Sequence, residues 1–231
     1  MKKPSHPLLI ELDRVLQDSA EPEYRATIRD HFRSNVDQFY GVRMPVIREC
    51  AASVVSPKIA DLQARWELCD ELTATGIFEH KIAAFHLARE ARKQWTEKDL
   101  PRFAGWLHEK VDDWMDTDDL CIRVIGEYFL RFPDQAQTVD DWSQKKNPWS
   151  RRGSAVALIP SARRGKQWEL VGKVAERLMN DHEPLVAKAC GWLLKDATRQ
   201  RPQEVRQLVE SAGDRMLPIV RRTALAKLPK S

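Results

Sequence analysis

The chain has 231 residues, of which 42% are hydrophobic and 31% are charged, a balance typical of globular proteins. No apolar run approaches the length of a membrane-spanning helix, and the N-terminal stretch MKKPSHPLLIELD lacks the apolar core of a signal peptide. These features exclude a membrane-embedded protein and favour a cytoplasmic one.

The net charge of +4 conceals an asymmetry along the chain. Residues 143–231 contain 19 Lys and Arg against 8 Asp and Glu, whereas residues 1–142 contain 19 Lys and Arg against 26 Asp and Glu. The C-terminal part is therefore basic by 11 charges and the N-terminal part acidic by 7. Such an imbalance indicates a polyanionic partner for the C-terminal part. A solvated helix surface without a partner is the alternative, but the bases cluster at predicted helix starts.

Helical periodicity recurs along the chain, and no stretch sustains the alternation of a β-strand. Most prolines stand at or just before the start of a helical stretch, and several glycines fall between stretches. Pro101 and Pro160 lie inside helical stretches, where a kink or an early stop is expected. We predict helices over residues 8–18, 22–33, 45–55, 58–74, 78–94, 97–110, 117–131, 134–145, 149–162, 166–179, 184–199, 203–211 and 218–228.

Four charged residues stand in register near the starts of predicted helices. Asp118, Arg152, Lys188 and Arg222 are separated by 34, 36 and 34 residues. Equivalent residues of stacked repeats line up along one face. The register therefore predicts a basic strip that contains one carboxylate, and we call these four positions the ladder.

A fixed period of this length is typical of stacked helix pairs. The spacing extends back to Ile82, which is 36 residues before Asp118. The TPR repeat has characteristic Trp, Gly-Tyr and Ala-Phe positions, and these do not recur in this sequence. HEAT-like repeats have a more degenerate pattern and therefore fit better. We predict an all-α protein, an α-solenoid (superhelix) of HEAT-like helical repeats with a concave basic cleft, forming a single domain over residues 1–231.

Two tryptophans share a helix face with ladder residues. Trp114 precedes Asp118 by four residues, and Trp192 follows Lys188 by four. An indole beside a basic strip can stack on a nucleotide or offer its π face to a cationic centre. Packing in the core is the alternative for both residues.

Trp149 and Arg152 begin the next repeat in NPWSRRGSA, and an arginine and the backbone N–H groups of a helix start can hold a phosphate. The four aspartates around Asp118 fit a simpler role, because acids cap helix N-termini and complement the helix dipole; they are Asp112, Asp113, Asp116 and Asp119. The histidines and cysteines form no metal-binding set, and no phosphate-binding glycine loop is present. We expect no metal and no cofactor.

Five segments together resemble one known family. YGVRMPVIREC occurs near the N-terminus, and DWMDTDDLCIRVIGEYFLRFP, NPWSRRGSAVAL, LVAKACGWLLKDATRQRP and LPIVRRTALAKL follow in order within residues 112–228. Each motif is weak alone, but the ordered set resembles the DNA alkylation repair proteins built from HEAT-like repeats, the AlkD-like alkylpurine DNA glycosylases.

The resemblance implies roles for individual residues. Asp118 matches the catalytic aspartate, Trp114 and Trp192 match tryptophans of the cleft, and Arg152 matches an active-site arginine. Arg221 and Arg222 match a basic pair that contacts the DNA backbone, and we expect Lys188 and Arg151 to contact DNA as well.

One residue departs from the family pattern. Relatives often carry two adjacent aromatic residues before the aspartate, and here the first of these is Asp113. The change replaces an apolar group by a charge that can repel phosphate. We expect it to affect substrate range and affinity.

The resemblance implies a monofunctional glycosylase that hydrolyses the N-glycosidic bond of cationic N3- or N7-alkylated purines in duplex DNA. We expect a monomer that is associated with the bacterial nucleoid when bound to DNA. The family also contains members that bind DNA without excising bases. A non-catalytic HEAT-repeat module that binds damaged or branched DNA is therefore the main alternative, and a scaffold for an acidic protein partner is a third.

Overall fold

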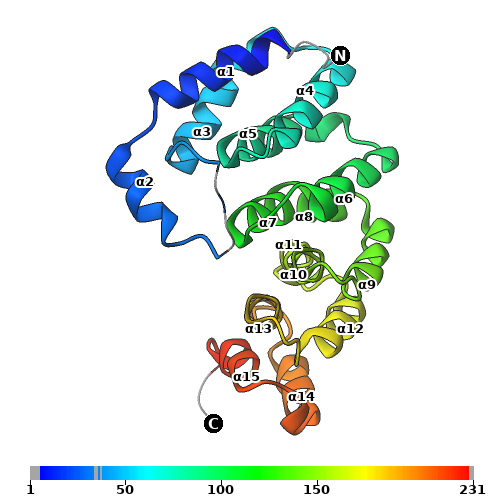
Figure 1. The fold of residues 1–231 in the computed structure, drawn as a ribbon. Coiled ribbons are helices and arrows are strands. Elements are labelled where there is room, and N and C mark those ends of the chain that lie inside the picture. Colours follow the sequence, from blue (N-terminus) through cyan, green and yellow to red (C-terminus); the bar gives the residue numbers. More distant parts are fainter. Residues whose placement is uncertain (1–5, 34–35, 37, 229–231) are drawn as a thin grey trace. The chain divides into compact units, whose positions relative to one another are not determined.

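The computed structural model describes residues 6–33, 36 and 38–228. All regular elements within these residues are helical, and no strand occurs among them (Figure 1). None of these helices is long and apolar enough to cross a membrane. We expected no signal peptide in the N-terminal stretch, and residues 1–5 of that stretch lie outside the described residues. The predicted all-α class is confirmed.

The chain divides into two compact units, Met1–Val124 and Ile125–Ser231, each with its own apolar core. The single domain expected for residues 1–231 stays a prediction. The first unit contains seven α-helices in its described residues: α1 (Pro7–Asp18), α2 (Pro22–Arg29), α3 (Met44–Cys50), α4 (Leu62–Ala74), α5 (Phe78–Glu90), α6 (Leu100–Glu109) and α7 (Trp114–Leu120). Short turns continue or precede them, namely the π-helix Ala51–Val55 and the 3₁₀ helices Ser56–Lys58, Ala91–Gln94 and Glu97–Asp99.

A π-helical turn, Cys121–Ile125, continues α7 into the second unit. The second unit holds α8 (Gly126–Arg131), α9 (Val139–Trp142), α10 (Pro148–Val156), α11 (Ile159–Ala162), α12 (Trp168–Leu178), α13 (Pro184–Ala197), α14 (Pro202–Ala212) and α15 (Pro218–Leu225). Two 3₁₀ helices, Pro133–Thr138 and Gly213–Arg215, precede α9 and α15.

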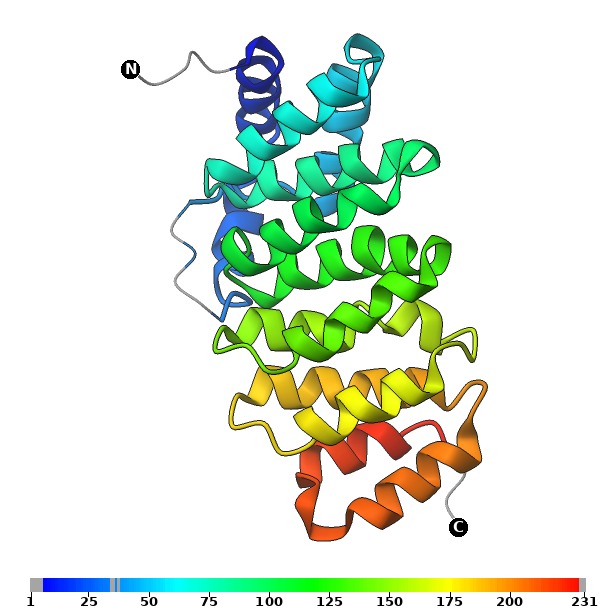
Figure 2. The same cartoon turned by 90° about the vertical axis from the view of Figure 1, so that its right-hand side faces the viewer.

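Helices that follow one another in the chain pack in pairs, as the predicted α-solenoid class requires. In the first unit α5 packs on α4, α3 and α7. In the second unit α13 packs on α10, α12 and α15, and α13 and the red α15 lie side by side (Figures 1 and 2). Gly191 permits the close approach of α13 and α15, because a Cβ atom at this position would come within 2.8 Å of Thr223 Cβ.

Most predicted helices are present, and the boundaries differ for local reasons. The helix predicted over 149–162 is interrupted after Val156, and Pro160 is the second residue of α11. Proline has no N–H to bond to the carbonyl of Val156, so the early stop expected at this proline is confirmed. The helix predicted from residue 117 begins instead at Trp114, because Asp113 is its N-cap.

The predicted register is present in the helices. Asp118, Arg152, Lys188 and Arg222 are each the fifth residue of their helix, in α7, α10, α13 and α15. Ile82 is likewise the fifth residue of α5. Proline is the first residue of α10, α13 and α15, and its fixed φ suits that position.

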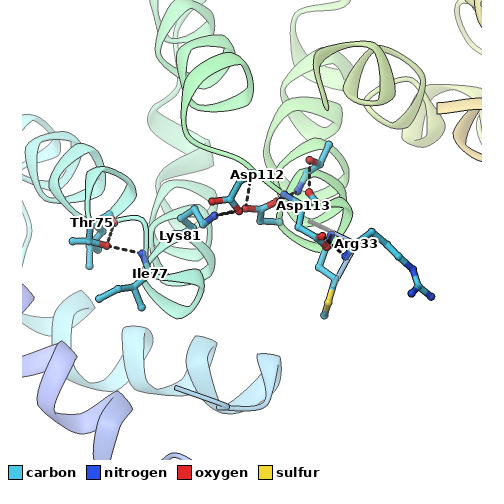
Figure 3. Close-up of polar contacts among 10 residues, drawn as sticks. Arg33, Thr75, Ile77, Lys81, Asp112 and Asp113 are labelled. Atoms are coloured by element: carbon cyan, nitrogen blue, oxygen red, sulfur yellow. Dashed lines mark hydrogen bonds and ion pairs between the residues drawn. The ribbon is translucent and has the colours of Figure 1, made fainter. Parts of the chain in front are cut away.

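A buried ion cluster joins the start of α5 to the start of α7. The ammonium group of Lys81 is fully buried and lies 2.6 Å from a carboxylate oxygen of Asp112 and 2.6 Å from one of Asp116 (Figure 3). Burial alone favours the neutral amine, but the carboxylates of Asp116 and Asp112 outweigh it and raise the pKa of Lys81 above its usual value. Lys81 therefore stays charged and holds the first turn of α7 on α5.

Replacing Lys81 by methionine should leave the buried carboxylate of Asp116 without its counter-charge. We expect Lys81→Met to lower the free energy of unfolding by about 3–5 kcal/mol in urea denaturation. The exposed Lys98 provides a control, since Lys98→Met should change it by no more than about 0.5 kcal/mol. Equal stability of the two variants would show that the cluster does not stabilise the unit.

Candidate functional site

The start of α7 is set by a capping box. The Asp113 side chain accepts N–H bonds from the first turn, and the Asp116 side chain accepts the N–H of Asp113 at 3.1 Å. Trp114 is consequently the first residue of the helix and Asp118 the fifth. Residues four apart lie on one helix face, so the predicted pairing of Trp114 with Asp118 on one face holds. Both side chains are half-buried.

The indole of Trp114 is held by a distant part of the chain. Its Nε1–H donates to the carbonyl oxygen of His31 at 2.9 Å. With this bond made and the residue half-buried, Trp114 is not a core residue. The ring has a fixed orientation beside the residue predicted to be catalytic.

Asp113 does not present a charge to solvent, contrary to the expectation that it would repel phosphate. The residue is 0% exposed. Its carboxylate accepts the backbone N–H of Arg33 at 2.7 Å and that of Met115 at 3.2 Å (Figure 3). The partial positive charge of the helix N-terminus also stabilises it. The expectation failed because the side chain turns into the capping box.

The four aspartates around Asp118 cap the helix or form ion pairs, and Asp116 does both. Asp113 and Asp116 cap α7, as predicted. Asp112 instead pairs with Lys81. Asp119 is buried and pairs with Arg48 and, at 3.7 Å, with Arg123. Burial raises the pKa of Asp119, although Arg48 and Arg123 oppose the shift.

Arg48 is a register position that sequence reasoning missed. It is the fifth residue of α3, equivalent to Ile82 in α5 and Asp118 in α7. The signal was present, because Arg48 precedes Ile82 by 34 residues within YGVRMPVIREC. Its guanidinium group bonds to Asp119, the direct neighbour of Asp118.

In the second unit, Arg152 and Arg151 have well-defined contacts. Arg152 is 5% exposed, and its Nη1 donates to the carbonyl of Leu185 in the first turn of α13. Arg151 forms a forked pair with Asp181, with distances of 2.7 and 3.1 Å, and donates to the carbonyls of Lys145 and Lys146. These contacts give Arg151 a structural role, and the DNA contact expected for it stays a prediction.

Lys188 and Trp192 lie four residues apart on α13, the former exposed and the latter half-buried. Trp192 lies near Asp196, which is one turn further along α13, is buried and pairs with Arg163 at 3.0 Å. Burial would raise the pKa of Asp196, but Arg163, Lys227 and Trp192 hold it below its usual value.

Arg221 and Arg222 lie on α15 beside an open hollow of about 660 Å³. Arg221 is half-buried and donates to the carbonyl of Gly213, whereas Arg222 is exposed. Gly213 has a φ of +52° and ends α14, a backbone conformation that favours glycine. Arg222 is thus the more accessible cation of the predicted basic pair.

Solved structures with a similar fold have low sequence identity to this chain. A predicted DNA alkylation repair enzyme from Enterococcus faecalis has a TM-score of 0.81 and 17% identity, covering 92% of this chain and 98% of that chain. AlkD2 from Streptococcus mutans has a TM-score of 0.66 and 16% identity, covering 97% and 100%. The protein smu.31 from Streptococcus mutans UA159 has a TM-score of 0.61 and 17% identity, covering 81% and 93%. These likenesses bear on the fold alone.

No curated protein matches the sequence. A family model does match it, over residues 12–228, and its description is DNA alkylation repair enzyme. The matched range includes every ladder residue, Trp114 and Trp192. This nearly complete match agrees with the helical-repeat fold and its register. By this match the chain belongs to the DNA alkylation repair enzyme family.

Proposed function

We propose that this protein is a monofunctional DNA glycosylase that releases cationic N3- or N7-alkylated purines from duplex DNA. Its family supports a role in DNA alkylation repair and DNA as the partner. One observation carries the finer proposal. Among the six equivalent positions in the described helices α3, α5, α7, α10, α13 and α15, only Asp118 is acidic. A protein that only gripped DNA would have no evident need of a carboxylate there, because it opposes phosphate.

The chemistry of the substrate explains the demand for a carboxylate. Alkylation at N3 or N7 makes the purine cationic, so the base leaves readily and needs little help from a general acid. As the glycosidic bond breaks, the deoxyribose acquires oxocarbenium character. A fixed carboxylate stabilises this positive charge, as in glycoside hydrolysis. We assign this role, and the orientation of the attacking water, to Asp118.

The two half-buried tryptophans support the same reaction. The indole N–H of Trp114 already donates to the carbonyl of His31, so this ring has a fixed orientation and its π face is left to interact with a ligand. Trp192 lies near the buried Asp196 on α13. We propose that the faces of both rings contact the deoxyribose, where a developing cation is attracted to an indole.

The basic ladder residues would hold the DNA backbone. Lys188 and Arg222 are exposed and have the flexible cationic side chains that phosphates attract. Arg152 is more buried and bonds to the Leu185 carbonyl, so we assign it a fixed position near the start of α13. Phosphate contacts position DNA without reading its sequence, which suits an enzyme that must find lesions in any context. No step of this proposal requires a metal or a cofactor.

A non-catalytic module that binds damaged or branched DNA is the alternative, and the basic ladder residues fit it equally well. The departure at Asp113 favoured it slightly, but that carboxylate is buried and bonded within the capping box. The base-release experiment separates the two functions.

The catalytic proposal predicts that purified protein releases 7-methylguanine from methylated duplex DNA. Asp118→Asn keeps the size of the side chain but removes its charge, and we expect the single-turnover rate to fall by at least about 100-fold. Asp134→Asn makes the same change at an exposed residue outside the ladder and should leave the rate unchanged. Absence of release by the wild-type protein would favour the non-catalytic module. Equal release by Asp118→Asn would remove the assigned role.

The phosphate contacts predict a particular salt dependence of binding to unmodified duplex DNA. Each of Lys188→Ala and Arg222→Ala should weaken binding and reduce the slope of log K against log salt by about 1. Lys166 is exposed on the link between α11 and α12, and Lys166→Ala is the charge-matched control. Fluorescence anisotropy at several salt concentrations measures these slopes. Slopes unchanged from wild type would argue against both contacts, and a protein that does not bind plain duplex would favour the scaffold alternative.

A further inference from the structure

We propose that Asp113 is a positioning residue for Trp114. Its buried carboxylate holds the segment His31–Arg33 against the start of α7, and this segment in turn fixes the indole. The catalytic consequence rests on the proposed glycosylase function. The anchoring itself does not, because it follows from contacts within the first unit.

The two carboxylate oxygens of Asp113 serve different parts of the chain. Oδ1 accepts the N–H of Met115, 3.2 Å away in the first turn of α7. Oδ2 accepts the N–H of Arg33, 2.7 Å away and 80 residues earlier in the sequence. The side chain also accepts the N–H of Asp116, so Asp113 both caps the helix and binds the distant segment. Asparagine and serine are good N-caps, but each offers a single acceptor oxygen. A carboxylate of this length is the side chain that satisfies both donors.

The segment held by Asp113 also binds Trp114. The indole N–H donates to the carbonyl of His31 at 2.9 Å, two residues before the amide that Asp113 accepts. Asp113, the N-cap of α7, and Trp114, its first residue, therefore bind the two ends of the same three-residue segment. Rotating the indole away would break its hydrogen bond. Releasing Arg33 would free the carbonyl that orients the ring.

Phe32, at the centre of this segment, gives it a rigid attachment. The side chain is buried and makes edge-to-face contacts with Phe39 and Phe78, with ring centroids 5.1 and 5.2 Å apart. Aromatic pairs of this geometry add to the stabilisation that burial provides. Phe78 is the first residue of α5, the helix whose Lys81 holds Asp116. The segment is thus held by the packing of Phe32 on Phe39 and Phe78, and by the hydrogen bond from Arg33 to Asp113.

The test separates the cap from the anchor. Asp113→Asn is nearly isosteric and keeps one acceptor for the cap, so α7 and the melting temperature should be largely preserved. The bond to Arg33 should be lost, and exchange of the Arg33 amide hydrogen should accelerate by at least about tenfold. The rate constant kcat for release of 7-methylguanine should fall while KM changes little, because the phosphate contacts are untouched.

Asp61→Asn is the matched control. It makes the same chemical change at another N-cap aspartate of the first unit, which accepts the N–H of Ala64 at the start of α4. The Arg33 amide should exchange at the wild-type rate in this variant. Equally fast exchange in both variants would overturn the proposal, because it would reflect a general loosening of the first unit.

A second pair of variants approaches the contact from Arg33. Arg33→Pro removes the N–H that Asp113 accepts, whereas Arg33→Ala retains it and removes only the side chain. Arg33→Pro should lower kcat beyond Arg33→Ala, and combining it with Asp113→Asn should add little, because both remove one interaction. Fully additive effects would overturn the proposal.

The outcomes distinguish this proposal from the proposed function. If the wild-type protein releases no base, the glycosylase function fails, while Arg33 amide exchange still tests the anchor. Wild-type exchange in Asp113→Asn overturns the anchor whatever the activity. Faster exchange with an unchanged kcat in an active enzyme overturns the positioning role.

Discussion

The start of α7, which carries Trp114 and Asp118, depends on the ion pairs between the buried ammonium group of Lys81 and the carboxylates of Asp112 and Asp116. The ammonium group has no access to solvent, so the carboxylates of Asp116 and Asp112 must neutralise it. Asp116 also completes the capping box that starts α7 at Trp114. Asp116 lies two residues before Asp118, so its ion pair with Lys81 fixes the rotation of the first turn of α7 relative to α5. The ion cluster thus helps to set the face on which the predicted catalytic carboxylate lies.

The two candidate tryptophans are both half-buried, and Trp114 has a well-defined anchor. The one donor of its indole is satisfied within its own unit by the carbonyl of His31. A half-buried ring held in this way has little rotational freedom. The conformational cost of ordering it is met on folding, before DNA binds. Such pre-organised aromatic faces suit a reaction in which positive charge develops on a sugar.

The register and the helix starts could be read from the sequence because both are local. Proline is the first residue of α10, α13 and α15, which makes Arg152, Lys188 and Arg222 the fifth residues of these helices. The spacing of these residues in the sequence therefore gives them the same position in successive helices. Arg48 belongs to the same series and was overlooked, although it precedes Ile82 by 34 residues, a spacing that also separates ladder residues. The stop before Pro160 was likewise predictable, since proline lacks the donor that a continuing helix requires.

The roles of Asp113, Arg151 and Asp119 were not readable in this way, because their partners are 80, 30 and 71 residues away. A charged side chain in a sequence is equally compatible with solvent, a ligand or a buried partner. The choice is made by whichever donors and acceptors packing brings within reach, since burial without them is costly. Composition, period and helix punctuation thus establish an all-α repeat protein with one acid among its bases. Long-range packing settles which of its charges are used to hold the fold and which remain accessible to a ligand.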